Sequence, residues 1–98
     1  MLVRIVKMTF RQDAVDNFRD FFQTRKESIR AFKGCNHLQL WQDSTELNVF
    51  FTYSLWENET ALLHYRNSAF FRDTWYYTRQ LFAAKAEAWS VNQIAVLQ

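Results

Sequence analysis

Two histidines are the side chains best suited to acid–base chemistry in this chain. An unperturbed imidazole titrates near neutral pH, so either ring could remove a proton from a phenol or an enol. His64 lies on a predicted helix near the rim of a predicted pocket, and His37 lies on a predicted strand with Gln39 and Thr52 as hydrogen-bonding neighbours. We therefore treat both as candidate catalytic bases. The structural alternatives are a partly exposed helix residue for His64 and a hydrogen-bonded interface residue for His37.

Aromatic and small polar side chains predict a pocket for a flat molecule. Trp56 ends an aromatic strand and is followed at once by a capped amphipathic helix, which places its indole at the mouth of whatever the sheet encloses. The side chains expected to shape the pocket are Trp56, Phe50 and Trp75. Those expected to supply hydrogen bonds are Thr52, Asn48 and Gln39.

Metal and thiol chemistry are not indicated. Cys35 is the only cysteine, so it cannot form an internal disulfide, and no cationic cluster is assured beside its thiol to activate it. Two histidines and one cysteine at unrelated spacing do not make a metal motif. We predict no metal and no cofactor, and the absence of a leader sequence or CxxC pair predicts a cytoplasmic location.

Composition favours a small-molecule protein over a nucleic-acid or membrane protein. The 98 residues carry a net charge of +2, and acidic residues interrupt any continuous basic stripe. No apolar segment approaches the length needed to cross a bilayer. Ten Phe, four Tyr and four Trp exceed what one two-layer core normally absorbs, so some should line a pocket or an interface. We expect one soluble domain over residues 1–98.

The elements that must position these side chains follow from periodicity and capping. Residues 2–10 read as a strand, and Asp13 can cap a helix that ends at Gly34, the only glycine. Residues 35–42 and 47–56 flank a polar turn and should form an antiparallel hairpin. Asn58 and Ser68 should cap two helical segments, the second running from 69 to about 82, and residues 89–97 read as a final strand. The order β-α-β-β-α-β predicts a ferredoxin-like α+β fold with a four-stranded antiparallel sheet.

Strand alternation predicts how the hairpin divides its side chains. The set expected beneath the helices is Leu38, Leu40, Val49, Phe51, Tyr53 and Leu55. The set expected on the open face is Cys35, His37, Gln39, Trp41, Asn48, Phe50, Thr52, Ser54 and Trp56. A second copy could cover this open face across a two-fold axis, with Trp41 as a dimer contact and the polar members converging in a cavity between the sheets.

The chain resembles the antibiotic biosynthesis monooxygenase family of dimeric α+β barrels. The resemblance is carried by Phe-Lys-Gly at 32–34, Phe-Thr-Tyr-Ser-Leu-Trp-Glu-Asn at 51–58, Ala-Leu-Leu-His-Tyr-Arg-Asn-Ser at 61–68 and Phe-Phe at 70–71. It covers nearly the whole chain and implies a homodimer. Members include cofactor-free oxygenases that form quinones from polycyclic phenols, haem-degrading enzymes, enzymes acting on small signalling molecules, and proteins with no known activity.

The residues at individual positions show which members of the family this chain resembles less well. This chain matches the quinone-forming members at Trp56, but it has Thr52 where they place Asn, Leu62 where they place Tyr, and Tyr76 where they place Arg. Thr52 can still hydrogen-bond a carbonyl or phenolate. Trp75 stands where the haem-degrading members place their iron-binding His, which argues against haem degradation.

Our leading interpretation is a cofactor-independent monooxygenase that oxidises a small aromatic or polyphenolic substrate with dioxygen, in a pocket between the sheet and helices of a homodimer. His64 or His37 would remove the proton, and Tyr76 joins the substrate-binding candidates. The alternative is a non-catalytic, ligand-binding or stress-related dimer of the same fold. An isomerase or lyase that uses the same histidine is a third possibility.

Overall fold

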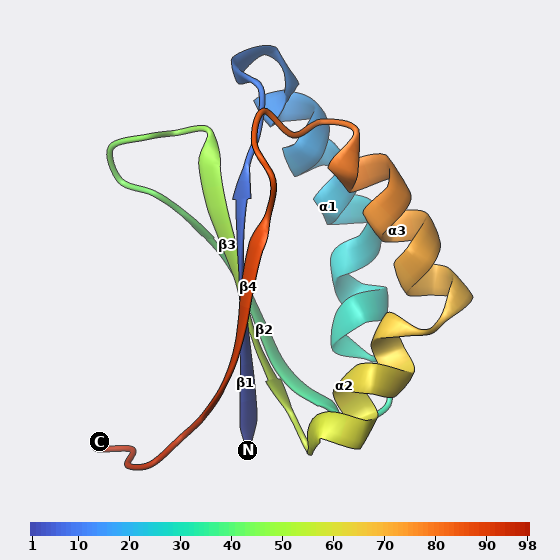
Figure 1. Cartoon of the computed structure of the whole chain (residues 1–98), viewed down its shortest axis with the longest axis vertical. Helices are drawn as coiled ribbons and strands as arrows, with labels where there is room; N and C mark the ends of the chain where they lie inside the picture. Colours follow the sequence, from blue (N-terminus) through green and yellow to red (C-terminus); the bar gives the residue numbers. More distant parts are fainter.

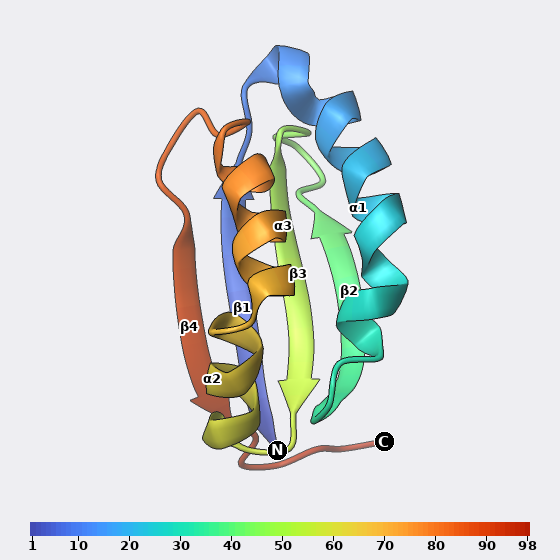
Figure 2. The same cartoon turned by 90° about the vertical axis from the view of Figure 1, so that its right-hand side faces the viewer.

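One antiparallel sheet with three helices on a single face makes up the protein. The computed structural model describes residues 1–98. Its elements are β1 (Leu2–Thr9), a 3-10 turn (Gln12–Ala14), α1 (Val15–Arg30), β2 (Cys35–Gln42), β3 (Val49–Trp56), α2 (Glu59–Arg66), α3 (Ala69–Arg79) and β4 (Glu87–Asn92). The strand order is β2-β3-β1-β4. Figure 1 shows the sheet edge-on with the helices on one side, and Figure 2 shows α1 lying apart from the stacked α2 and α3. The predicted ferredoxin-like α+β fold is confirmed.

Helix ends follow the capping pattern at two of three predicted positions. Asn58 Oδ1 accepts a hydrogen bond from the Ala61 N–H at 2.9 Å, and Ser68 Oγ accepts one from the Phe71 N–H at 3.1 Å. The predicted cap at Asp13 is wrong. The chain enters α1 through the 3-10 turn, which places Asp13 within that turn and makes Ala14 the residue before the helix. The Asp13 carboxylate instead lies 3.5 Å from the Arg11 guanidinium.

The last strand is shorter than predicted because its partner strand ends. β4 pairs with β1 from Glu87 opposite Lys7 to Asn92 opposite Leu2. Since β1 begins at Leu2, residues 93–97 have no strand left to pair with. They form a tail that leaves the sheet on the side away from the helices, as Figure 1 shows at its lower left. Ile94 and Leu97 on this tail are 93% and 94% exposed.

The predicted division of the hairpin between the two faces is wrong for β3, and it is wrong for Cys35 of β2, which belongs to the buried core because the register shifts between Cys35 and His37. Gln42 pairs with Phe50 and Leu40 with Thr52, so the loop between paired residues has odd length. The Asp43 carboxylate helps to set this loop by accepting hydrogen bonds from the backbone N–H groups of Thr45 and Glu46 at 3.0 and 2.8 Å. A shift of one residue exchanges the faces of a strand. The side chains that share the helix-facing side with Leu38 and Leu40 are therefore Phe50, Thr52, Ser54 and Trp56, and those on the open face with His37, Gln39 and Trp41 are Phe51, Tyr53 and Leu55.

This register fills the core with aromatic rings. The Phe10 ring stacks on Phe18 with centroids 4.1 Å apart, and the Phe50 ring lies 5.3 Å from Phe18. Phe50 and Trp56, predicted to need cover from a second copy, are buried beneath the helices of their own subunit. Each such aromatic side chain removes a large apolar area from water, which stabilises the contact between the sheet and the helices.

Gly34 lies between α1 and β2 in the chain and packs against the start of α2. Its φ of +87° lies in the left-handed region, and a Cβ built on it would overlap the Ala61 side chain of α2. The Gly34 carbonyl accepts a hydrogen bond from the Glu57 N–H at 2.8 Å, directly after Trp56. The predicted conformational role of this glycine is therefore confirmed, and it also permits close approach of α2.

Substitution Gly34→Ala should lower the free energy of unfolding by about 2–4 kcal/mol, because it adds left-handed strain to a steric overlap with α2. Urea unfolding followed by circular dichroism measures the change. The adjacent, exposed Lys33→Ala is the control and should stay within about 0.5 kcal/mol of the wild type. Equal urea midpoints for the two variants would contradict the role given to Gly34.

Candidate functional site

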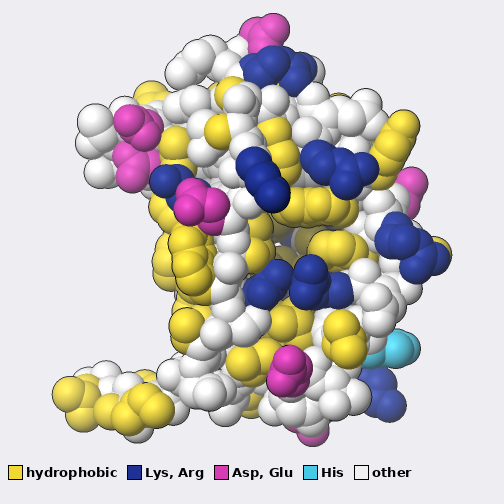
Figure 3. Space-filling model, viewed as in Figure 1, with side chains coloured by type: hydrophobic (Ala, Val, Ile, Leu, Met, Phe, Trp, Pro, Cys, Tyr) yellow, Lys and Arg dark blue, Asp and Glu magenta, His cyan; other side chains and the backbone are white.

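A cavity of about 330 Å³ lies between the helix-facing side of the sheet and the helices. We call it the inner cavity. Its aromatic lining is Phe18, Phe22, Trp56, Tyr65, Phe71 and Trp75. Its polar lining is Arg4, Thr52, Ser54, Arg66, Thr74 and Thr78. Figure 3 shows the opening as a hollow between the sheet and the helices, with hydrophobic atoms inside and Lys or Arg side chains above and below it. Its size and mostly apolar lining are typical of small-molecule sites.

Trp56 forms a fixed wall of the inner cavity. Its indole N–H donates to Ser54 Oγ at 2.9 Å, and that hydroxyl lies 3.4 Å from the Arg4 carbonyl, to which it donates. The Tyr65 ring of α2 stacks on the indole with centroids 4.9 Å apart. The indole N–H is thus occupied within the protein, and Trp56 offers a ligand its apolar surface.

Aromatic rings from α2 and α3 continue this wall. Tyr65 packs edge-on against Phe71 at 5.0 Å, and Phe71 stacks on Trp75 at 5.9 Å with their planes 10° apart. Burial raises the pKa of the Tyr65 phenol far above its ordinary value, so this hydroxyl stays protonated near neutral pH. Such a surface suits a flat, apolar ligand.

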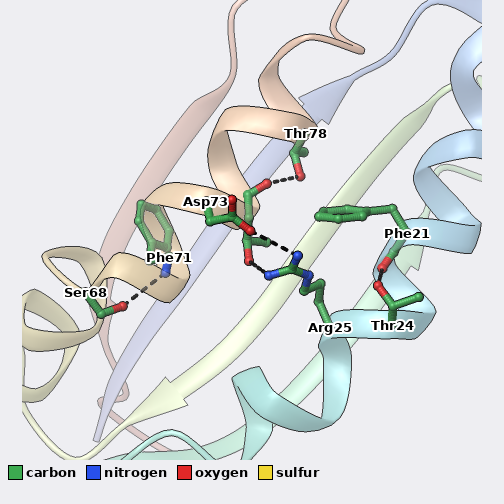
Figure 4. A network of polar contacts seen from close by, with 8 residues as sticks. Phe21, Thr24, Arg25, Ser68, Phe71, Asp73 and Thr78 are labelled. Carbon is green, nitrogen blue, oxygen red and sulfur yellow. Dashed lines mark hydrogen bonds and ion pairs between the residues drawn. The ribbon is translucent and has the colours of Figure 1, made fainter.

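Arg25 holds α3 in place over the cavity. Its guanidinium lies 3.0 Å from the Asp73 carboxylate and donates to Thr74 Oγ1 at 3.3 Å, linking α1 to α3. It also lies over the Phe21 ring at 5.0 Å. Figure 4 shows Arg25 reaching from α1 to α3 with Phe21 beside it. Because Thr74 belongs to the cavity lining, this link fixes one wall of the site.

Two arginines that line the cavity, Arg4 and Arg66, are not among the predicted site residues. Arg4 lies on β1, where its guanidinium donates to Ser90 Oγ at 3.0 Å, and Arg66 is the last residue of α2. Neither takes part in the ion pairs of the structure. Burial, with a smaller effect from the charge of Arg66, lowers the pKa of Arg4. The sequence did contain one signal for Arg4, since this charged residue lies within a largely apolar strand.

The structure brings three of the predicted site residues together. Thr52, Trp56 and Trp75 all line the inner cavity. Phe50 is buried beside Phe10 and Phe18. Two further predicted residues lie elsewhere: the Asn48 amide donates to the Phe10 carbonyl at 2.9 Å, and Tyr76 is exposed on α3.

Neither histidine lines the inner cavity. His37 lies on the open face, where its Nε2 is 2.7 Å from Gln39 Nε2, and Gln39 Oε1 accepts a hydrogen bond from the Trp41 indole at 2.7 Å. His64 is exposed on α2, with its ring 5.8 Å from the Phe32 ring. The predicted site thus divides into a group in the cavity and a group on the open face.

A second hollow of about 810 Å³ runs between α1 and the edge strand β2. Phe22, Leu38 and Leu40 form its floor, and Arg19 and Lys26 stand along it. It is larger than the inner cavity, but it is more open to solvent, and fewer of its lining residues are hydrophobic. We therefore place the functional site in the inner cavity.

No Cys, His, Asp or Glu side chain lines the inner cavity. Cys35 is buried, and burial raises the pKa of its thiol, which keeps it in the unreactive protonated form. No three His, Cys, Asp or Glu side chains are grouped so that they could hold a metal ion. The structure also contains no helix with the length and apolar character needed to span a bilayer.

Known structures share this fold at low sequence identity. A structure described as an antibiotic biosynthesis monooxygenase superposes with a TM-score of 0.90 at 16% identity, covering 97% of this chain and 100% of its own. Protein Rv0793 from Mycobacterium tuberculosis gives 0.88 at 15%, covering 99% and 98%. A conserved protein from Methanosarcina mazei gives 0.88 at 16%, covering 95% and 93%.

Sequence comparison gives the family directly. A search of curated proteins found no match. The family model for antibiotic biosynthesis monooxygenase matches residues 1–75, which include β1 through most of α3 and nearly all of the inner cavity lining. This chain belongs to the antibiotic biosynthesis monooxygenase family.

Proposed function

We propose that the protein is a cofactor-independent monooxygenase that oxidises a small aromatic or polyphenolic substrate with dioxygen in the inner cavity. The observation that carries this proposal is the aromatic-walled cavity itself, with Thr52 and two arginines beside fixed rings, in a chain of this family. A flat substrate stacks between Trp56 and the rings of α2 and α3. Thr52 donates a hydrogen bond to a substrate carbonyl or phenolate oxygen.

Such a reaction needs no external reductant when the substrate has an oxidisable ring carbon. Conversion of an anthrone CH₂ group to a quinone carbonyl releases four electrons, which is the number that dioxygen needs to place one oxygen atom in the product and the other in water. The first electron leaves the substrate after it has lost a proton to become an anion. The protein then has to bind the substrate, stabilise its anion and exclude bulk water.

The proposed active form is a homodimer that buries the open face of the sheet. Trp41 and Trp89 on that face are 42% and 44% exposed, and Val91 beside Trp89 is also exposed. Figure 3 shows hydrophobic side chains along the side of the sheet opposite the helices and on the C-terminal tail. A two-fold axis would bring this patch against its own copy, which removes it from water. His37 and Gln39 would then face the partner subunit.

Oxygen uptake with a panel of anthrones and hydroquinones tests the proposed reaction. The wild type should consume oxygen above the blank, and Thr52→Val should lower kcat by about tenfold or more because a donor to the developing oxyanion is lost. The exposed Thr60→Val on α2 is the matched control and should keep wild-type activity. Absence of uptake with every substrate would overturn the proposal and leave a ligand-binding protein.

The general-base role of His64 or His37 stays a prediction that the same assay decides. Because neither ring lines the inner cavity, we expect His64→Ala and His37→Ala each to retain more than about half of the wild-type kcat. A fall of about a hundredfold or more in either variant is what loss of a general base produces, and it would place that histidine in the reaction.

Substitution Trp41→Glu should dissociate the proposed homodimer, because it replaces an apolar contact of the proposed interface by a charge. Analytical ultracentrifugation measures the mass of the particle. Tyr76→Glu is the control, since Tyr76 is exposed on the opposite, helical side and its charge should leave the dimer intact. A Trp41→Glu protein that still sediments as a dimer rules out this face as the interface.

A further inference from the structure

The inner cavity holds two positive charges and no negative one. Arg4 comes from β1 and Arg66 from the end of α2, and both line the cavity. The ion pairs of the structure use other residues: Lys7 with Glu87, Arg11 with Asp13, and Arg25 with Asp73. No Asp or Glu is among the residues that line the cavity.

This arrangement is electrostatically unfavourable, because no acidic side chain of the lining balances the two positive charges. Arg4 is half-buried, and the only side-chain hydrogen bond from its guanidinium goes to the neutral hydroxyl of Ser90. The positive charges of Arg4 and Arg66 repel each other. Two like charges near an apolar surface repel more strongly than they would in open water. An anion bound between them would relieve this repulsion and gain charge-assisted hydrogen bonds.

We propose that the inner cavity binds its ligand as an oxyanion, a flat apolar molecule whose carboxylate or phenolate oxygen lies against the guanidinium groups of Arg4 and Arg66. The location of the ligand rests on the proposed function. The rings of Trp56, Phe71 and Trp75 hold the flat part, and the planar guanidinium groups match the geometry of the charged end.

An oxyanion site made by two arginines also removes the need for a side-chain base in the reaction. When the ligand is a phenol, the two arginines lower the pKa of its hydroxyl, and the O–H bond breaks as the phenol enters, with the proton passing to solvent water at the opening of the cavity. The phenolate stays bound. A side-chain base is then unnecessary, in agreement with the absence of both histidines from the cavity lining.

Calorimetric titration with 2-naphthoate and 2-naphthamide tests the preference for an anion. The two probes share a ring and differ in charge, so we expect 2-naphthoate to bind at least tenfold more tightly. Arg66→Gln and Arg4→Gln should each weaken 2-naphthoate binding by about tenfold, equivalent to about 1.4 kcal/mol, and leave 2-naphthamide binding unchanged. Arg79→Gln, an exposed arginine of α3 outside the cavity, removes the same charge and should change neither affinity.

Equal affinities for the two probes, or an equal loss of 2-naphthoate binding in Arg79→Gln, would overturn the proposal. Arg66 is exposed at a helix end, so its substitution should leave the fold intact. If Arg4→Gln fails to fold, the affinities of Arg66→Gln for the two probes test the proposal. Near-ultraviolet circular dichroism checks the folding of each variant.

Absorbance titration of 4-nitrophenol distinguishes the two kinds of oxyanion. Bound phenolate is visible at a pH where the free phenol is still protonated, and Arg66→Gln should remove this shift. If the absorbance shows bound 4-nitrophenolate and 2-naphthoate also binds more tightly than 2-naphthamide, the site accepts both phenolates and carboxylates. If only the tighter binding of 2-naphthoate is seen, the site is assigned to carboxylates.

These probes do not have to be oxidised, so their binding is independent of oxygen uptake. Preference for 2-naphthoate without oxygen uptake on any substrate would support the anion site and refute the monooxygenase. Oxygen uptake with equal binding of the two naphthalenes would support the monooxygenase and refute the anion site.

Discussion

The pairing of Gln42 with Phe50 across the β2–β3 hairpin decides what each face of the sheet can do. It turns Phe50 into the helix-facing core and aligns Thr52, Ser54 and Trp56 on the same side. With the pairing shifted by one residue, Phe51, Tyr53 and Leu55 would take these places and the indole–hydroxyl contact between Trp56 and Ser54 would move to the open face. The inner cavity therefore depends on one loop, which the Asp43 carboxylate stabilises through its hydrogen bonds to Thr45 and Glu46.

The same register separates two kinds of surface. On the helix side, aromatic rings and two arginines without an ion pair line a small cavity, which is where we propose that a flat molecule with one charged end binds. On the open side, exposed indoles lie beside a hydrogen-bonded network of His37, Gln39 and Trp41, and this is the face that we propose a second copy of the chain covers. The proposed ligand site and the proposed dimer interface therefore lie on opposite faces of one sheet, and β3 contributes side chains to both faces.

Local signals predicted the fold well because they act within a few residues. The caps at Asn58 and Ser68 and the left-handed Gly34 each depend on near neighbours, and the structure confirms them. The face of β3 depends on how an irregular loop closes, and alternation within each strand cannot give the alignment between strands. The end of β4 depends on where β1 begins, which the sequence of β4 does not contain.

The candidate site was predicted only in part for the same reason. Thr52, Trp56 and Trp75 were found as residue types suited to a ligand, and they do line one cavity. Arg4 and Arg66 lie far apart in the sequence and meet only because the sheet and α2 bring them together, so no spacing rule could join them. The histidines were singled out by their chemistry and by a predicted position beside the pocket, and the register of β3 places Thr52 on the opposite face of the sheet from His37.

Which side of the sheet holds the ligand is the central question, and the four indole N–H signals of ¹⁵N-labelled protein answer it most directly. Trp56 and Trp75 line the inner cavity, whereas Trp41 and Trp89 lie on the open face. Titration with 2-naphthoate should shift the Trp56 and Trp75 signals and leave those of Trp41 and Trp89 in place. Shifts confined to Trp41 and Trp89 would contradict the account and move the site to the surface between subunits.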